Sequence, residues 1–484
     1  MDRSSVTQRL QTVLPDRGLI LDEAGRRPYE TDGLTAIRQL PWAVALPTTE
    51  EQVLEILAVC REAEIPIVPR GAGTGLSGGA RPLEDGLLLS LARMNRIVEI
   101  DPANSVARVQ PGVRNLAISE AAAAHGLFYA PDPSSQIACS IGGNVAENAG
   151  GVHCLKYGLT VHNVTALRVA TIDGTVHEFG GHGHDAFGID FPAVLCGSEG
   201  MLGIVLEATV RLVPLPEEKR VLMAAFESLG EAGEAVARLI GSGLIPAGLE
   251  MMDRLAVQAA EDFAHAGYPR DAAALLLCEL DGTAEEVAET CALATGVFES
   301  CGATSVEVAV DAEAQARMWQ GRKSAFPAVG RLAPDYYCMD GTIPRHRLSE
   351  VLEAIARMSS AYDLRVANVF HAGDGNLHPL ILYDANEPGQ LEKAERFGGE
   401  ILELCVRVGG TVTGEHGVGI EKLDQMCAQF PEAELNQFFR LKAAFDGTGL
   451  LNPGKAIPTL SRCAEVGGMH VHAGELPFPH LDRF

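Results

Sequence analysis

A run of closely spaced glycines near the start of the chain limits the folds that it can adopt. Five glycines fall in Arg70-Gly-Ala-Gly-Thr-Gly-Leu-Ser-Gly-Gly79, and the part from Gly73 to Gly78 matches the GxGxxG pattern. In a Rossmann fold a helix begins at these glycines and runs beneath the pyrophosphate of a dinucleotide. Here Pro82 and Gly86 follow within eight residues of the pattern, and a helix does not survive both. A Rossmann fold is therefore excluded at this segment.

Two further runs of small residues follow the first. One leads from Pro131 into Cys139-Ser-Ile-Gly-Gly-Asn-Val-Ala-Glu-Asn-Ala-Gly-Gly151, and the other is Gly197-Ser-Glu-Gly-Met-Leu-Gly-Ile-Val205. Glycine loses much backbone entropy on folding and adds no packing, so such runs indicate nests of N–H groups around a large anionic cofactor. The residues expected to hold this cofactor are Pro69, Arg70, Gly71, Ala72, Gly73, Thr74, Gly75, Ser77, Gly78, Pro133, Ser135, Ser140, Gly142, Gly143, Asn148, Gly151, Gly200, Gly203 and Ile204.

The remaining pattern predicts an α+β protein. Short β-branched runs before Pro214 are punctuated by helices, such as the one for which Thr49 is the expected N-cap. Pro214-Leu-Pro-Glu-Glu-Lys219 ends this part, because two prolines do not continue a central strand. Beyond it, alanine-rich helices alternate with apolar strands, which predicts an antiparallel sheet covered by helices. The expected parts are a helical lead-in (1–40), a cofactor-binding domain (41–216), a substrate- and metal-binding cap domain (217–446), a return segment near the cofactor (447–460) and a tail that contacts a partner (461–484).

Charge and cysteine content restrict the partners and the setting. The net charge of −26 comes from 38 basic and 64 acidic residues, so the surface repels nucleic acid and anionic lipid. No apolar stretch approaches the ~20 residues that cross a bilayer, and the polar N-terminus lacks the apolar core of a signal peptide. The 11 cysteines form no CxxC pair, which predicts reduced thiols and no iron–sulfur cluster in this chain. We expect a cytoplasmic protein that meets the inner face of the membrane only through partners.

Two histidines and a carboxylate form a candidate metal site. The segment His371-Ala-Gly-Asp-Gly-Asn-Leu-His378 predicts two strands joined by a turn, with both imidazoles side by side, and Glu415 lies in a later glycine loop. A two-His, one-carboxylate set suits zinc, manganese or iron. A lone turn histidine usually only hydrogen-bonds locally, but this set of three favours a divalent metal. His416, beside Glu415, is the candidate general base for an alcohol proton.

Several of these segments resemble one known family of flavoenzymes. The three glycine runs are similar to the FAD-binding domain of the vanillyl-alcohol oxidase and p-cresol methylhydroxylase superfamily. One branch of this superfamily acts on D-2-hydroxy acids. The chain resembles that branch at His371–His378, Gly414–Lys422 and Leu451-Asn-Pro-Gly-Lys455. The large flavin subunits of bacterial glycolate oxidases are most similar at Tyr29–Gly33, Arg462–His472 and Leu476–Pro479. The resemblance implies a two-subdomain FAD-binding domain of the p-cresol methylhydroxylase type and an α+β cap domain with an antiparallel sheet.

The resemblance also implies roles for individual residues. It assigns Arg322 to the substrate carboxylate, which a bidentate guanidinium matches well, although most helix arginines are only solvated. Asn452, with Lys455, is expected near the pyrimidine edge of the flavin. Several superfamily members link FAD covalently through a histidine in the first glycine loop. This loop has Thr74 and no histidine, so non-covalent FAD is expected.

These features favour FAD-dependent oxidation of glycolate, and of D-lactate, to the 2-oxo acid. His416 would take the hydroxyl proton, and hydride would pass to flavin N5. Electrons would go on to a partner subunit or the quinone pool, and the resemblance implies a second flavin-type subunit and an iron–sulfur subunit. The alternative is a D-lactate or D-2-hydroxyglutarate dehydrogenase acting alone. A zinc hydrolase would leave the glycine runs unexplained, and a non-catalytic flavin subunit would be expected to lack His416 or Arg322.

Overall fold

A computed structural model describes residues 2–15, 17–183, 188–309, 311–459 and 463. Contacts within the chain define two compact units. Unit 1 comprises Met1–Ala149, Leu159–Val213 and His416–Phe484, and unit 2 comprises Gly150–Gly158 and Pro214–Glu415. Each unit therefore combines segments that are separate in the sequence. The consecutive domain ranges given above stay a prediction, and the tail 461–484 lies outside the described residues except for Cys463.

Unit 1 contains two main sheets. The first has the order β1 (Leu19–Ile20), β2 (Ala43–Ala45), β4 (Leu87–Ser90), β3 (Ile67–Arg70), and β4 runs parallel to both β2 and β3. The second is antiparallel, in the order β5 (Ile97–Asp101), β6 (Val106–Val109), β10 (Ile204–Arg211), β8 (Val164–Ala170), β9 (Val176–Gly180). The first sheet ends at β3, from which the glycine loop of residues 70–79 departs.

Helices cover both sheets of unit 1. The long helix α3 (Glu50–Ala63) begins at Thr49, whose side chain accepts a hydrogen bond from the amide of Gln52, and the expected N-cap is confirmed. Its buried positions Val53, Ile56, Leu57 and Cys60 follow helical spacing and form one core with α1 (Arg3–Val13) and the first sheet. The helices α4 (Asn115–Ala122) and α5 (Ile141–Glu147) bury their apolar faces in a second core with the second sheet. The other helices of this unit are α2 (Glu23–Arg26), α7 (Thr160–Asn163), α8 (Phe191–Leu195), α16 (Leu423–Gln429) and α17 (Glu432–Phe445).

One expectation about the cysteines is wrong. Cys427 in α16 and Cys463 form a disulfide, with their Cα atoms 5.3 Å apart. The two are 36 residues apart in the sequence, so their spacing gave no sign of pairing. The fold brings them together, and both belong to a small apolar cluster that includes Leu435 of α17. The other nine cysteines are free thiols.

Unit 2 is built on an antiparallel sheet, as expected. Its strands follow the order β15 (Ser305–Val308), β12 (Glu218–Phe226), β14 (Ala274–Gly282), β13 (Gly248–Asp253), β18 (Val366–His371), β19 (Asn376–Leu377), β17 (Gly341–Thr342). β20 (Pro379–Tyr383) pairs with β18 and with β16 (Asp335–Cys338). Every one of these pairs is antiparallel.

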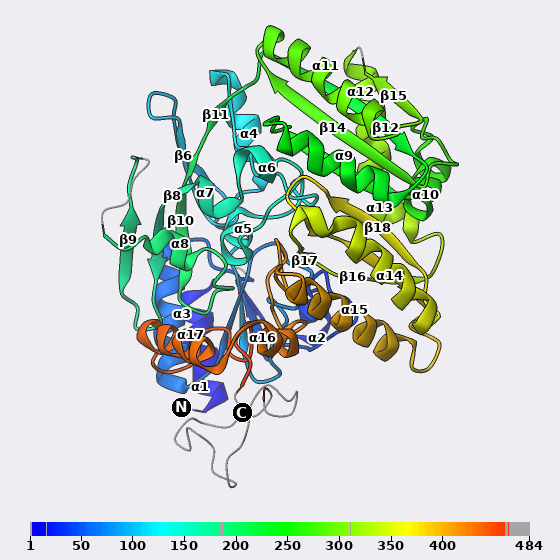
Figure 1. The fold of residues 1–484 in the computed structure, drawn as a ribbon. Coiled ribbons are helices and arrows are strands. Elements are labelled where there is room, and N and C mark those ends of the chain that lie inside the picture. Colours follow the sequence, from blue (N-terminus) through cyan, green and yellow to red (C-terminus); the bar gives the residue numbers. More distant parts are fainter. Residues whose placement is uncertain (1, 16, 184–187, 310, 460–462, 464–484) are drawn as a thin grey trace. The chain divides into compact units, whose positions relative to one another are not determined.

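Helices lie on both faces of the unit 2 sheet (Figure 1). Alternate residues of β12 point to opposite sides: Met223 joins the core of α10, α12 and α13, while Phe226 packs on Phe298 of α11. The helices of this unit are α6 (Cys154–Tyr157), α9 (Leu229–Gly241), α10 (Arg254–Ala264), α11 (Ala284–Ser300), α12 (Ala312–Lys323), α13 (Ala325–Val329), α14 (Leu348–Tyr362) and α15 (Gln390–Arg407). No helix among the described residues combines the length and the hydropathy needed to span a membrane.

Candidate active site

The glycine loop of unit 1 has close contacts at Gly71 and Gly73 that leave no room for a side chain. A Cβ on Gly71 would lie 2.3 Å from Ser140 Oγ, and one on Gly73 would lie 2.0 Å from the Arg70 guanidinium. Arg70 is buried, and its Nη1 donates to the carbonyl of Thr31 at 2.6 Å. Gly73 also has φ +75°, a left-handed value that favours glycine. Arg70 therefore packs against the inner side of the loop and does not face solvent.

The same loop offers an unfilled set of hydrogen-bond donors. Within the described chain, the amides of residues 72–77 donate to no acceptor, and the buried hydroxyls of Ser77 and Ser140 have no partner. A cavity of about 380 Å³ adjoins the loop and is lined by Ala72, Gly112, Ala138 and Ser140 among others. Buried polar groups are normally satisfied. Amides and hydroxyls around a cavity fit a phosphate-bearing cofactor such as FAD.

The second and third glycine runs pack against this loop or its strand. Ser140 precedes α5, and a Cβ on Gly142 would lie 2.7 Å from Pro111. A Cβ on Gly200 would lie 2.3 Å from the ring of Pro69, and one on Gly203 would lie 2.5 Å from Val169. These glycines let segments of backbone approach one another closely, which is a packing role around the cradle.

Other predicted cofactor residues are placed less directly. The Asn148 side chain accepts from the amide of Val161 at 2.9 Å, so it is engaged with the backbone. Pro133 and Ser135 form a turn in which their carbonyls accept from the amides of Gln136 and Cys139. Ile204 is buried at the start of β10. Gly151 belongs to unit 2, apart from the rest of the set.

The C-terminal return segment reaches the glycine loop within unit 1. The Ile67 amide donates to Leu450 at 2.7 Å, and the Asn452 amide donates back to Ile67 at 2.7 Å, beside β3. The Asn452 side chain donates to the carbonyls of Gly79 at 3.0 Å and Glu199 at 2.6 Å. Lys455 donates to Asn452 Oδ1 at 3.3 Å, and its burial lowers the pKa of the ammonium to about 8. Both residues thus adjoin the cradle that is proposed for FAD.

The three predicted metal ligands come together in unit 2. His371 ends β18, and the turn to β19 brings His378 alongside, with the two ring centroids 5.1 Å apart. Oε1 of Glu415 lies 3.2 Å from His371 Nε2 and 2.8 Å from His378 Nε2. Ligand atoms bound tetrahedrally at ~2.0–2.1 Å are roughly 3.3 Å apart. The two distances to Glu415 therefore fit neighbouring ligands of one divalent ion. In this unit, the ligand atoms that lie within 4.8 Å of one another are those of Asp340, His378 and Glu415.

Further buried groups hold the two histidine rings and the loop of Glu415 in place for metal binding. His371 Nδ1 lies 2.7 Å from Glu250 Oε1, and His378 Nδ1 lies 3.3 Å from the carbonyl of Met339. Donation from both Nδ1 atoms leaves both Nε2 lone pairs for a metal, which is the usual outer-shell arrangement. Asp340 accepts from the amides of Gly414 and Glu415 at 3.1 Å each and so fixes the loop that carries the carboxylate.

Arg322 belongs to the same buried network. It is 3% exposed on α12, its Nε donates to Glu250 Oε2 at 2.8 Å, and its Nη2 forms an ion pair with the same oxygen at 2.7 Å. It is therefore not a solvated helix charge. Because only the Nε–Nη2 edge faces Glu250, the Nη1 side of the fork is the part that a substrate carboxylate could use.

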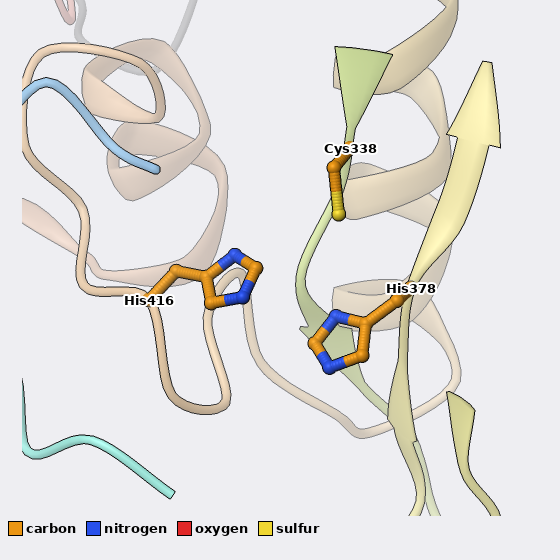
Figure 2. Close-up of side chains that lie close together, drawn as sticks. All are labelled: Cys338, His378 and His416. Carbon is orange, nitrogen blue, oxygen red and sulfur yellow. The ribbon is translucent and has the colours of Figure 1, made fainter. Parts of the chain in front are cut away.

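Figure 2 displays the side chains of Cys338 and His378, which lie at the ends of neighbouring segments of unit 2, together with His416. Cys338 ends β16, and its Sγ lies within 4.8 Å of a His378 ring nitrogen. His416 directly follows Glu415 and is the first residue of the last segment of unit 1. Along the sequence, unit 2 therefore ends at the proposed metal ligand Glu415 and unit 1 resumes at the proposed base His416.

Sequence reasoning missed several residues that support these sites. Glu250, Asp340 and Glu199 are buried carboxylates that hold site residues or their backbone. Lys422 is fully buried and donates to the carbonyl of Gly417 at 2.9 Å. A charged residue inside the apolar strand Gly248-Leu-Glu-Met-Met252 was an available signal for Glu250. The other three lie in loops, where a charged residue is common.

Comparison with known proteins gives the family. Residues 41–180 match the model of an FAD binding domain, and residues 215–456 match that of the FAD linked oxidases, C-terminal domain. The glycolate oxidase subunit GlcD of Escherichia coli (strain K12) is 60% identical over 484 residues, which cover 100% of this chain and 97% of that protein. The chain belongs to the FAD-linked oxidases.

More distant relatives and a solved structure support the assignment of this FAD-linked oxidase to its family. GlcD of Bacillus subtilis is 40% identical over 89% of this chain and 92% of its own length, and a D-lactate dehydrogenase of Anaerostipes hadrus is 31% identical over 93% and 96%. The solved structure of p-cresol methylhydroxylase with substrate bound has a TM-score of 0.81 at 18% identity, covering 95% of this chain and 97% of that one. The fold is therefore of the p-cresol methylhydroxylase type, and the chain is an FAD-dependent oxidoreductase.

Proposed function

We propose that this flavoenzyme oxidises glycolate, and also D-lactate, to the corresponding 2-oxo acid. The observation that carries the proposal is the buried network in which Glu250 joins Arg322 to His371, since it combines a carboxylate-binding group with a metal ligand. A 2-hydroxy acid presents a carboxylate and a hydroxyl on adjacent carbons, and these are the two groups that such a network could bind. The 60% identity to a glycolate oxidase subunit supports glycolate as the substrate.

Each proposed site residue then has a distinct task. Arg322 pairs with the substrate carboxylate, and His371, His378 and Glu415 hold a zinc, manganese or iron ion. The metal supplies Lewis acidity, which lowers the pKa of a bound hydroxyl. His416 takes the hydroxyl proton. FAD, held without a covalent bond in the cradle of unit 1, supplies a two-electron acceptor for the hydrogen on Cα. In this oxidation the alcohol would lose its hydroxyl proton to His416, and FAD would supply the acceptor for the hydride from Cα.

We further propose that the electrons leave through partner subunits, a second flavin-type subunit and an iron–sulfur subunit. The name of the Escherichia coli relative, a subunit of glycolate oxidase, supports an assembly. A second candidate is a D-lactate or D-2-hydroxyglutarate dehydrogenase that acts alone. The relative in Anaerostipes hadrus, a D-lactate dehydrogenase, favours the first of these. One methyl group in a pocket changes preference by only about 1–3 kcal/mol, so the two substrates can overlap.

Anaerobic mixing tests the proposal. The purified protein, loaded with FAD and metal, is mixed with glycolate, D-lactate, L-lactate or D-2-hydroxyglutarate while flavin absorbance is followed. We expect fast bleaching by glycolate and D-lactate and none by L-lactate. If D-2-hydroxyglutarate bleaches the flavin and glycolate does not, the protein would instead be assigned as a D-2-hydroxyglutarate dehydrogenase. Bound FAD that none of the four acids reduces would contradict the substrate class for the isolated chain.

A further inference from the structure

The loop that carries His416 is held inside unit 1 by the buried carboxylate of Glu199. Glu199 is 3% exposed and follows α8 in the turn at Ser198. Its Oε1 accepts from the amide of Val418 at 2.7 Å, and its Oε1 and Oε2 lie 3.1 and 2.8 Å from the amide of Gly419. These amides belong to the second and third residues after His416, so the carboxylate grips the backbone close to the proposed base.

The loop is fitted closely around this carboxylate. Gly417 and Gly419 have φ values of +80° and +54°, in the region that favours glycine. A Cβ on Gly417 would lie 1.9 Å from Glu147 Oε2 and 3.1 Å from Glu199 Oε1. A Cβ on Gly419 would lie 2.0 Å from the carbonyl oxygen of Ser77. The successive amides form a nest, a backbone shape that binds an anion, and the anion here is a side chain of the protein itself.

Further hydrogen bonds tie the loop to the FAD cradle. The carbonyl of Ser77, in the glycine loop, accepts from the amides of Ile420 at 3.0 Å and Glu421 at 3.1 Å. The carbonyl of Glu199 accepts from the Asn452 side chain, which also donates to Gly79. Glu199 therefore lies where the glycine loop, the return segment and the loop of His416 meet, all within unit 1.

The charge of the neighbouring carboxyl group is consistent with this arrangement. Burial and the adjacent Glu199 raise the pKa of Glu147 well above its usual range, and no hydrogen bond reaches its Oε2 in the described chain. Burial also raises the pKa of Glu199, but the amides of Gly419 and Val418 oppose that shift. The amides of Val418 and Gly419 thus favour the ionised form of Glu199 over that of Glu147.

We propose that Glu199 is a positioning residue for the oxidation, since its carboxylate fixes residues 417–419 and thereby the orientation of His416 relative to the FAD cradle. The inference rests on the proposed role of His416 as base. Glu199→Gln keeps the shape of the side chain but turns one acceptor oxygen into an NH₂ group, which cannot accept from an amide.

The test compares flavin reduction in four variants: Glu199→Gln, His416→Ala, the double variant, and Glu84→Gln as a control at an exposed glutamate of unit 1. All are checked for FAD and metal content before anaerobic mixing with glycolate. We expect Glu199→Gln to retain both groups and its KM, and to lose about 10²-fold in limiting rate, as a misplaced catalytic group does. The double variant should be no slower than His416→Ala, because the two changes remove the same contribution. Glu84→Gln should match wild type.

The outcomes separate the two proposals. Slow flavin reduction in His416→Ala together with wild-type flavin reduction in Glu199→Gln would overturn only the positioning role of Glu199. A double variant slowed by the product of the single effects would show that Glu199 acts independently of His416, and would overturn it too. Wild-type flavin reduction in His416→Ala would overturn the base role and, with it, this inference.

A measurement on wild-type protein covers the case in which Glu199→Gln does not fold. Hydrogen exchange of the FAD-loaded protein should show slow exchange at the amides of Val418 and Gly419, because both donate to a buried carboxylate. Where Glu199→Gln does fold, these two amides should exchange faster, while those of Ile420 and Glu421 should change less. Fast exchange at Val418 and Gly419 in the wild type would overturn the proposal.

Discussion

Glu250 Oε1 lies 2.7 Å from the Nδ1 of His371, while the other oxygen of the same carboxylate accepts a hydrogen bond from Arg322 Nε and pairs with its Nη2. Burial alone would raise the pKa of Glu250, but the charge of Arg322 and the hydrogen bonds with His371 and Arg322 lower it, so the carboxylate is ionised. The proposed metal ligand and the proposed substrate-binding group are therefore linked through one side chain. A change in either will reach the other.

Replacing Glu250 by glutamine should affect both metal and substrate. Loss of a carboxylate behind a ligating histidine typically costs about 10–100-fold in metal affinity. We expect Glu250→Gln to lose that much in a competition assay with a chelating dye, and to raise KM for glycolate. Glu234→Gln is the control, because Glu234 pairs with Arg238 on the exposed surface of α9. Unchanged metal affinity in Glu250→Gln would contradict the link.

Removing the metal should leave FAD in place. The proposed ligands lie in unit 2, whereas the cradle loops and Asn452 lie in unit 1. Dialysis against a chelator should therefore abolish reduction by glycolate but preserve the flavin absorbance, and zinc, manganese or iron should restore the activity. Simultaneous loss of FAD and metal would show that the two sites depend on each other.

The flavin should come off without breaking a covalent bond. The glycine loop of residues 70–79 contains Thr74 and no histidine. Precipitation with trichloroacetic acid should leave a yellow supernatant with about one FAD for each chain. A cofactor held only by hydrogen bonds from amide donors is released when the protein unfolds. A fluorescent band on a denaturing gel would indicate a covalent link that the sequence does not predict.

Acid should weaken unit 2 through Glu279. This buried carboxylate lies 3.1 Å from His153 Nε2, 3.0 Å from Lys219 Nζ and 2.8 Å from Trp319 Nε1. Burial alone would raise its pKa, but the hydrogen bond with His153 and the charge of Lys219 lower the pKa of Glu279 to about 2. Below the unfolded value of about 4.5 the unfolded chain binds the extra proton, so stability falls as pH drops from about 4.5 to 2.

The size of this contribution is testable. The shift corresponds to about 3 kcal/mol at neutral pH. We expect Glu279→Gln to unfold earlier in urea at pH 7 and to lose less stability between pH 4.5 and 3 than wild type does. Glu285→Gln, at an exposed position of α11, is the control. Equal acid sensitivity of all three proteins would contradict the assignment.

Features that depend on residues close together in the sequence were predicted well. The glycine loops, the N-cap at Thr49 and the antiparallel sheet of unit 2 were all foreseeable from turn residues and apolar spacing. The pairing of His371 with His378 followed from the length of the turn between them.

Features that depend on distant parts of the chain were not foreseeable. Nothing near Glu199 indicates that it will meet amides 219 and 220 residues further on, and nothing near Cys427 indicates Cys463. The division into two discontinuous units has the same origin, because contact between residue 67 and residue 451 leaves no mark in either segment. A single sequence records such pairs only through the chemistry of isolated residues.

The late arrival of the return segment has a consequence for biosynthesis. Strand β3 is an edge strand until Leu450–Asn452 bond to Ile67, and these residues are made 383 to 385 positions after it. At ~5–20 residues per second, the ribosome needs roughly 20–80 s to produce them. During that time the edge is open to pairing with other nascent chains. Because the return segment adjoins the proposed FAD cradle, we expect flavin loading to follow the synthesis of these residues.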